Sequence, residues 1–345
     1  MMTLPLIYDL TLPELESLLE NWGEPRYRAQ QIWQGLYQRF WNTPEDFSSL
    51  PKTLRQKLSE NLAFTHLTAE RTLDSTDGET RKTLFRLPDG QAIEAVLMRY
   101  SKRRTLCIST QAGCAMGCTF CATGQMGFRR NLSSGEIVEQ VLYYARHLAQ
   151  EQEAVTNIVV MGMGEPFHNY ESTLAAMHRL NDPQGYNFGQ RRITISTVGL
   201  VPMIRRFTKD GGQINLAISL HAANDELRTT MLPIDKKYPI SQVLEACRDY
   251  VTQTHRRVTF EWALIHEVND TSEQAHQLGK LLKGLLCHVN AIPLNPTTGY
   301  NGKATTRQRA QEFQKILESY GVSCTIRLRR GIDIQAGCGQ LAILA

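Results

Sequence analysis

The stretch GCAMGCTFCATG at residues 113–124 carries three cysteines on what reads as one short loop. Cys114, Cys118 and Cys121 follow the spacing C-x₃-C-x₂-C, which brings three thiols within eight residues. Three such thiolates can bind three irons of a cubane [4Fe–4S] cluster and leave the fourth iron open to another ligand. Glycines at positions 113, 117 and 124 allow the loop to curl closely around an inorganic core. We therefore predict an iron–sulfur site, with a structural zinc site or an inert buried trio of cysteines as alternatives.

Strand and helix patterns alternate on the C-terminal side of residue 105. The expected strands are residues 105–110, 157–161, 192–197, 214–220, 258–264, 288–293 and 323–328. The expected helices between them include residues 133–149, 241–254, 272–285 and 306–320. Strands separated by crossover helices form a parallel sheet with right-handed connections. Six or seven such units are too few for a closed eightfold barrel, so we predict an α/β fold with a partial (β/α)₆ barrel.

The segments before and after this core differ from it in pattern. Residues 1–68 read as a small helical accessory domain, in which Thr11 and Glu14 form a capping box. Asp-Gly pairs predict β-hairpins in residues 69–104, which form an extension of the core. The core itself is expected over residues 105–328, followed by a C-terminal loop and tail at 329–345. Within the core, the polar stretch 295–306 is expected to be the most flexible loop.

Composition and charge narrow the class of protein. The chain has 345 residues, 42% hydrophobic and 21% charged, which excludes a disordered or fibrous protein. We find no apolar run of membrane-spanning length and no basic leader before an apolar stretch, so a cytoplasmic location is expected. In that compartment eight cysteines indicate metal binding or catalysis rather than structural disulfides. The formal net charge is +4, and many basic residues stand in pairs that suit either a polyanionic substrate or an ordinary solvated surface.

The cysteine loop resembles that of the radical S-adenosylmethionine (SAM) enzymes, in which an aromatic residue such as Phe120 precedes the third cysteine. Those enzymes bind the methionine end of SAM on the open iron, inside a partial (β/α)₆ barrel. The segment GMGEP at 162–166 resembles their glycine-rich loop. Four motifs together are similar to one branch, the RlmN-type adenine-C2 methyltransferases of 23S rRNA and tRNA, over roughly the whole chain: QAGCAMGCTFCATG at 111–124, MGMGEP at 161–166, SLHA at 219–222 and AGCGQL at 336–341. The Cfr-type C8 methyltransferases are close relatives of this branch.

The resemblance implies a specific chemistry, because C2 of adenine offers no lone pair for an ordinary methyl transfer. One SAM methylates Cys338 to S-methylcysteine, and a second yields a 5′-deoxyadenosyl radical that activates that methyl group. Glu94 is implied as the proton acceptor, and Cys107 as the thiol that resolves the intermediate through a transient disulfide with Cys338. From the residues alone, Cys107 would read as a core cysteine, and Cys338, between two glycines, could be either a mobile reactive thiol or incidental. Glu94, in an otherwise apolar strand, could be an edge-strand charge or a buried base, and we favour the base.

The same resemblance implies the contacts to SAM. These residues are Gly164, Glu165, Ser196, Ser219, Leu220, His221 and Asn295. Most stand at the carboxyl ends of predicted strands, where barrels place their ligands. The serines could equally cap the following helices, and His221 could be an ordinary loop histidine. Cys247, Cys287 and Cys324 match no implied role and are expected to be packing residues.

The binding partners of the protein follow less directly from the sequence than its cofactors do. The target adenine must leave its stack to reach a buried radical, so a single-stranded or loop region of RNA is expected. Candidate phosphate contacts are Arg129, Arg130, Arg327, Arg329 and Arg330 near the site, and Arg26, Arg28, Arg39 and Trp33 in the helical domain. Trp33 could instead be part of a scaffold core. An electron donor such as flavodoxin or ferredoxin, a thiol reductant and a monomeric state are also expected.

Some observations leave the function open. Gln335 and Gly337 stand where family members often carry Asp and Ala, which puts substrate preference in doubt. The stretch around Asn295 favours C2 over C8 methylation. A radical SAM enzyme acting on a small molecule, or a non-catalytic iron–sulfur protein that binds RNA, are the alternatives from other classes.

Overall fold

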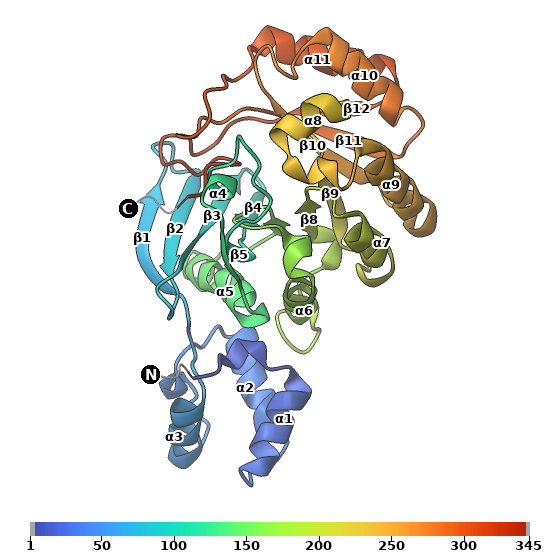
Figure 1. Ribbon diagram of the computed structural model, residues 1–345. Helices are drawn as coiled ribbons and strands as arrows, with labels where there is room; N and C mark the ends of the chain where they lie inside the picture. The colour runs from blue at the N-terminus through green and yellow to red at the C-terminus, as the bar shows by residue number, and fades with distance from the viewer. Residues whose placement is uncertain (1–3, 343–345) are drawn as a thin grey trace.

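One large sheet organises the molecule in the computed structural model, which describes residues 4–342. Its ten strands lie in the order β1-β2-β3-β4-β7-β8-β9-β10-β11-β12 (Figure 1). Their bounds are β1 Thr68–Asp74, β2 Thr80–Arg86, β3 Ala92–Tyr100, β4 Arg103–Cys107, β7 Asn157–Val160, β8 Ile193–Thr197, β9 Asn215–Ser219, β10 Val258–Leu264, β11 Cys287–Pro293 and β12 Ser323–Ile326. Strands β1 and β12 are the two edges, so the sheet is curved but not closed.

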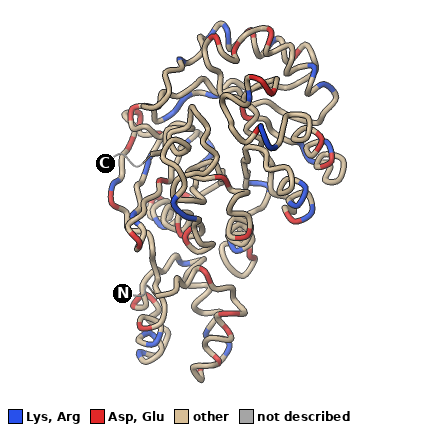
Figure 2. The backbone as a smooth tube through the Cα atoms, viewed as in Figure 1, with Lys and Arg blue, Asp and Glu red and all other residues tan. Residues whose placement is uncertain are grey.

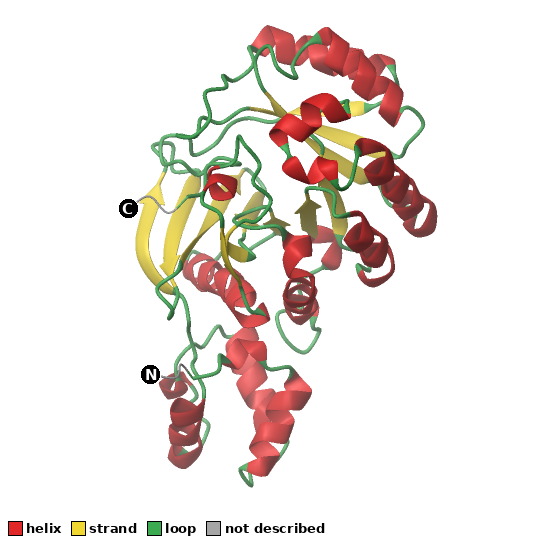
Figure 3. Cartoon of the chain, in the orientation of Figure 1, coloured by secondary structure: helices red, strands yellow, loops and turns green. Residues whose placement is uncertain are grey.

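The half of the sheet from β4 to β12 is parallel throughout. The helices that connect these strands follow the outer side of the curve, while the loops after the strands gather inside it (Figure 3). The outer helices are α5 Ser134–Gln150, α6 Tyr170–Asn181, α7 Val201–Asp210, α9 Ile240–Thr254, α10 Ser272–Leu282 and α11 Arg307–Ser319. The short helix α8 Asp225–Met231 lies inside the curve instead, where Met231 packs with Cys118 and Phe120 of the cysteine loop (Figure 1). The predicted partial (β/α)₆ barrel is confirmed, because strands and crossover helices alternate as the sequence indicated.

The other half of the sheet is antiparallel and continues the barrel outward. Strands β1, β2 and β3 form consecutive hairpins, and β3 pairs with β4 in a register that sets Val96 opposite Cys107. Gly78 and Gly90 have φ of +68° and +79°, the left-handed conformation that these Asp-Gly turns require. Because β3 lies between β2 and β4, Glu94 is not an edge-strand charge.

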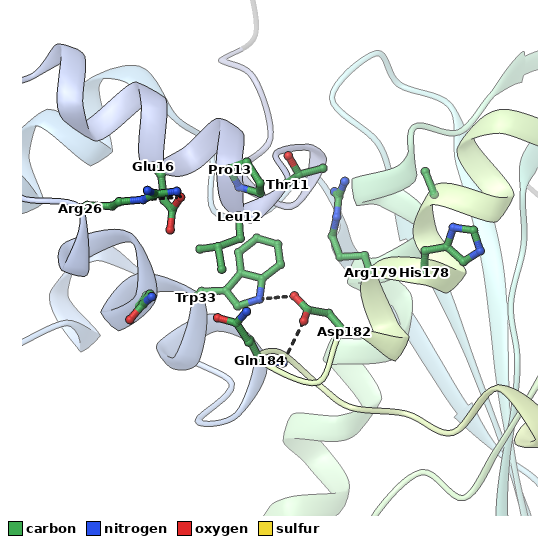
Figure 4. A pocket seen from close by; sticks show the side chains of 12 residues that line it. Thr11, Leu12, Pro13, Glu16, Arg26, Trp33, His178, Arg179, Asp182 and Gln184 are labelled. Atoms are coloured by element: carbon green, nitrogen blue, oxygen red, sulfur yellow. Dashed lines mark hydrogen bonds and ion pairs between the residues drawn. The ribbon is translucent and has the colours of Figure 1, made fainter.

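A helical module sits below the barrel, with helices α1 Leu12–Asn21, α2 Tyr27–Tyr37 and α3 Lys52–Asn61 (Figure 1). The predicted capping box is present, since Thr11 Oγ1 accepts from the Glu14 amide and the Glu14 carboxylate accepts from the Thr11 amide. Trp33 is 2% exposed and donates its indole N–H to Asp182 at 2.9 Å, just beyond α6 (Figure 4). Trp33 therefore belongs to the core that joins module and barrel, as the scaffold interpretation required.

A small element around the cysteine loop was not predicted from the sequence. Strands β5 Gln111–Gly113 and β6 Phe128–Asn131 form a separate two-stranded antiparallel sheet, and helix α4 Ala122–Gln125 lies between them. These elements are too short for a periodic pattern to reveal them. Among the described residues, no helix combines the length and apolar character needed to cross a membrane.

Candidate active site

The cysteine loop is held closed at its base and across its middle. The Cys114 amide donates to the Gly127 carbonyl at 3.0 Å, which ties the start of the loop to β6. Gly113 has φ of +74°, and a Cβ there would stand 1.9 Å from the same carbonyl oxygen. A Cβ on Gly124 would stand 2.9 Å from the Cys118 carbonyl oxygen. Two of the three predicted glycines are therefore needed for close backbone approach.

The three thiols fit the predicted cluster. Burial raises the pKa of Cys114 to about 12 and also raises the pKa values of Cys118 and Cys121. Within residues 4–342, no three His, Cys, Asp or Glu side chains converge as ligands of one metal ion. This is no obstacle to a cubane, because each thiolate binds its own iron and the sulfurs stand further apart than ligands of a single ion. Cluster binding must displace the thiol protons.

Glu165 connects three segments beside the cluster loop. Its carboxylate accepts from the amides of Phe167 at 3.0 Å and Val198 at 2.9 Å, and its own amide donates to Gln111 at 2.9 Å. Burial raises its pKa to about 7. The preceding Gly164 has φ of +101°, and a Cβ there would lie 2.6 Å from the Gln111 Cβ. The predicted glycine-rich loop is thus built against β5, whose Gln111 the sequence analysis did not single out.

The next two strands end side by side in the parallel sheet. Ser196 in β8 and Ser219 at the end of β9 bring their hydroxyl oxygens to 3.4 Å. Leu220 is fully buried, and its amide donates to the Glu261 carbonyl at 3.1 Å. Neither serine caps the helix that follows its strand: α7 has no side-chain cap at its N-terminus, and α8 is capped by the side chain of Asn224. Both hydroxyls therefore remain available at the carboxyl edge of the sheet.

His221 is fixed as a neutral ring. Its Nδ1 accepts from the Ala263 amide at 2.9 Å, so the ring proton resides on Nε2. Burial and the nearby Arg228 guanidinium lower its pKa to about 3. The ring packs edge-on against Phe120 with centroids 4.9 Å apart, which joins the cluster loop to the end of β9.

A buried arginine that the sequence analysis missed braces these strand ends. Arg228 on α8 is completely buried and pairs with Asp235 at 2.6 Å. It also donates to the carbonyls of Val198 at 2.7 Å and Leu220 at 3.1 Å, which follow β8 and β9. One guanidinium thereby holds together the two loops that carry the predicted SAM contacts. Only the tertiary contacts distinguish it from exposed arginines on other helices, such as Arg206 and Arg248.

The C-terminal loop docks on the cluster element. The Ala122 amide donates to the Gly339 carbonyl at 2.8 Å, and the Thr123 hydroxyl donates to the Leu341 carbonyl at 2.6 Å. Asn295 donates from Nδ2 to the Cys338 carbonyl at 3.0 Å. The Oδ1 of Asn295 is buried without a hydrogen-bond partner among the described residues, as expected of a group that awaits a ligand. In Figure 1 the red C-terminal segment accordingly runs beside α4.

This docking places the Cys338 thiol within electrostatic reach of Cys107. Cys338 reaches solvent, yet the surrounding protein desolvates its thiol and, with Glu261, Cys107 and Cys121 nearby, raises its pKa to about 12. Burial likewise raises the pKa of Cys107 to about 12. All eight cysteines are free thiols, so the structure contains no disulfide between Cys107 and Cys338. Cys247, Cys287 and Cys324 are buried packing residues, as predicted.

Glu94 is buried against a lysine that the sequence analysis did not consider. Lys82 on β2 places Nζ 2.8 Å from Glu94 Oε1, and both side chains are at most 7% exposed. Burial raises the pKa of Glu94, while the Lys82 ammonium opposes that rise. The pair also holds the C-terminal loop, since Lys82 donates to the Gln335 carbonyl at 3.2 Å and Glu94 accepts from the Ala342 amide at 3.0 Å. Glu94 is therefore a buried carboxylate at the edge of the site.

The basic residues proposed as phosphate contacts are less free than the sequence suggested. Arg130 is engaged by both Asp89 and Glu136, and Arg330 pairs with Glu79. Arg26 in the helical module pairs with Glu16 (Figure 4). Basic and acidic residues also alternate along the outer helices in Figure 2. Arg129 and Arg329 remain exposed near the site without a recorded ion pair in the described chain.

The site thus combines a three-cysteine loop, a glycine-rich loop after the next parallel strand and strand-end hydroxyls in an open barrel. Residues 108–278 match the family model of the radical SAM superfamily. The chain is a radical SAM enzyme, and its cofactors are a [4Fe–4S] cluster and SAM.

Closer relatives narrow the class. Residues 6–63 match the N-terminal domain of the ribosomal RNA large subunit methyltransferase. A relative from Myxococcus xanthus, named dual-specificity RNA methyltransferase RlmN 1, is 50% identical and covers 97% of this chain and 93% of its own. A radical SAM methyltransferase from Sphaerobacter thermophilus superposes with a TM-score of 0.96 at 51% identity, covering 98% of this chain and 99% of the other. The chain belongs to the RlmN family of radical SAM RNA methyltransferases.

Proposed function

We propose that this enzyme methylates C2 of adenosine in both 23S rRNA and tRNA, in the cytoplasm, and that Cys338 carries the methyl group. The observation that supports this most directly is the docking of the C-terminal loop on α4, which holds Cys338 beside the cysteine loop. When bound, the cluster and SAM supply the radical that activates a methyl group for an electron-poor carbon.

The chain's own residues then have distinct tasks. Gly164, Glu165, Ser196, Ser219, Leu220, His221 and Asn295 form the proposed SAM site. Glu94 is the proposed acceptor of the ring proton, for which a burial-raised pKa is suited. Cys107 is proposed to attack the sulfur of Cys338, which releases the product and leaves a disulfide.

Turnover of this scheme needs help from outside the chain. The disulfide between the two cysteines must be reduced by an external thiol, and a flavodoxin or ferredoxin is the proposed electron source. We propose that a monomer suffices. We also propose four functional segments, with helical module 1–68, hairpin extension 69–104, core 105–328 and reactive loop 329–345.

Nucleoside mass spectrometry tests the proposal. Anaerobically reconstituted enzyme is incubated with SAM, reductant and rRNA or tRNA lacking the modification, and the digest is compared with authentic isomers. 2-Methyladenosine is expected from both pools with the wild type and with Cys324→Ala, but not with Cys338→Ala. 8-Methyladenosine would move the enzyme to the C8 branch. Absence of any methyladenosine, with 5′-deoxyadenosine still formed, would overturn the assigned substrate.

A further inference from the structure

A strongly basic pocket opens at the end of the barrel opposite the cysteine loops. It has a volume of about 760 Å³, and most of the residues that line it lie at or near the amino-terminal ends of the parallel strands. Arg103 begins β4, Asn157 begins β7 and Asn215 begins β9. The reactive loops lie at the carboxyl ends of the same strands, so the mouth of this pocket faces the other way. Its lining extends into the barrel through Asn290 and through Arg327, which follows β12 and influences the pKa of Cys338.

Tertiary structure gathers arginines here from distant parts of the chain. Arg103, Arg191, Arg256, Arg257 and Arg327 all line the pocket, and His255 and His288 lie among them. None of the thirteen lining residues identified in the described chain is Asp or Glu. Arg191, from the basic pair at 191–192, and both arginines of the pair at 256–257 therefore contribute to one concave surface rather than to scattered solvated patches.

No direct ion pair of the described chain compensates the arginines of this pocket, although buried Glu261 accepts from the lining residue Asn290 at 3.0 Å, and Arg327 opposes the rise in pKa that burial gives this carboxylate. None of its five arginines forms an ion pair within residues 4–342, whereas Arg104, next to Arg103, pairs with Glu153. Neutral groups hold two of the five instead. Arg256 donates to the Asn215 side chain at 2.7 Å, and Arg191 donates to the Gln213 side chain at 2.8 Å. Amide partners fix a guanidinium in place without reducing its charge.

The positive charge of the pocket also influences the pKa of a histidine that lines it. The pKa of His288 is lowered by burial first and then by Arg257 and Arg327. Five like charges on one surface repel one another, and a bound anion would relieve that repulsion. Guanidinium groups bind phosphate oxygens in a bidentate manner, so arginine rather than lysine lining suits phosphate.

We propose that this pocket is a binding site for an anion with two adjacent phosphate groups. The volume is within the range of small-molecule sites and exceeds what one phosphate needs. Such adjacent phosphates occur both in a free nucleotide-like ligand and in consecutive nucleotides of an RNA strand. The pocket opens away from the loops that carry the proposed SAM contacts, and Arg327 is a lining residue that also influences the pKa of Cys338.

Calorimetric titration of reconstituted enzyme with inorganic pyrophosphate at low salt tests the site. The double variant Arg103→Gln/Arg257→Gln removes charges from two sides of the pocket. The matched control Arg205→Gln/Lys209→Gln removes two charges from the outer helix α7. We expect pyrophosphate affinity to fall at least about tenfold in the pocket variant, and less than about twofold in the control. Failure of the wild type to bind, or equal loss in both variants, would overturn the proposal.

Competition then identifies the source of the phosphates. Fluorescence anisotropy follows a labelled single-stranded RNA oligonucleotide as pyrophosphate is added. Two results together support an RNA strand as the ligand. Pyrophosphate displaces the RNA, and in the pocket variant the slope of log affinity against log salt concentration is smaller in magnitude by roughly 1.4, as expected for two lost phosphate contacts. Pyrophosphate binding without displacement and with unchanged RNA affinity supports a free ligand.

Discussion

The Lys82–Glu94 pair offers a direct test of how the site is held together. Both side chains are almost fully buried, and they meet at 2.8 Å. Replacing Lys82 by Met leaves the buried Glu94 carboxylate with one remaining hydrogen-bond partner in the described chain, the backbone amide of Ala342. Removal of one member of a buried pair typically costs about 3–5 kcal/mol. For a chain of 345 residues this corresponds to a fall in Tm of about 4–7 °C.

The double variant Lys82→Met/Glu94→Leu distinguishes loss of pairing from loss of packing. Because both charges are then absent, most of the lost stability is expected to return. Differential scanning calorimetry of the reconstituted proteins provides the measurement. The control is Arg86→Met, which removes a cation from the same strand but from an exposed pair with Glu70, and should change stability by no more than about 1 kcal/mol.

The same variant has a functional consequence if Glu94 is the proton acceptor. Without the ammonium, the pKa of Glu94 rises further, so the acidic limb of the pH–rate profile should move toward higher pH by at least about one unit. The reasoning is refuted if Lys82→Met lowers Tm no more than Arg86→Met does, or if the double variant is as unstable as the single one. An unshifted pH profile in a stable Lys82→Met enzyme would argue against Glu94 as the acceptor.

Three further substitutions test other parts of the site. Gly164→Ala introduces a Cβ 2.6 Å from a neighbouring side chain at φ of +101° and should weaken SAM binding at least about tenfold in equilibrium dialysis, whereas Gly189→Ala, in open space, should not. Burial raises the pKa of Glu261 from 4.5 to about 7, so its stabilising contribution is complete below pH 4.5 and is lost as the pH rises through 7. Above pH 7, the free energy of unfolding of Glu261→Gln in denaturant titrations should therefore exceed that of the wild type by about 3 kcal/mol. If the unfolding free energies of variant and wild type changed equally with pH, the prediction would be contradicted. Arg228→Met leaves buried Asp235 unpaired and should cost about 3–5 kcal/mol by calorimetry, with SAM affinity reduced because the loops after β8 and β9 lose their brace; unchanged Tm would exclude that role.

The local patterns of the sequence predicted most of the architecture. Alternating strands and helices, the Asp-Gly turns and the capping boxes at Thr11 and Ser133 all depend on residues within a few positions of one another. Such short-range signals remain readable without tertiary information. The three-cysteine loop belongs to the same category, because its ligands lie within eight residues.

Contacts between segments that are distant in sequence could not be predicted from those local patterns. Nothing near Lys82 in sequence indicates that it pairs with Glu94, since the partnership arises from the pairing of β2 with β3. Arg228 looks like any helix-surface arginine until α8 packs beneath the loops after β8 and β9. Arg130 illustrates the converse, because its apparent freedom disappears once Asp89 and Glu136 approach it.

The sequence by itself determined the class of chemistry, because metal-binding cysteines and a glycine-rich turn are specified by residue type at short spacing. Only the tertiary structure decided which groups surround that chemistry. The loop that carries Cys338 binds to α4 through Gly339, and Asn295 Oδ1 is left without a hydrogen-bond partner among the described residues. Five arginines from distant segments line one pocket of the barrel. The burial of a side chain and the charges around it depend on every segment that packs against it. A short stretch of sequence does not contain this information, because the packing segments are distant in sequence.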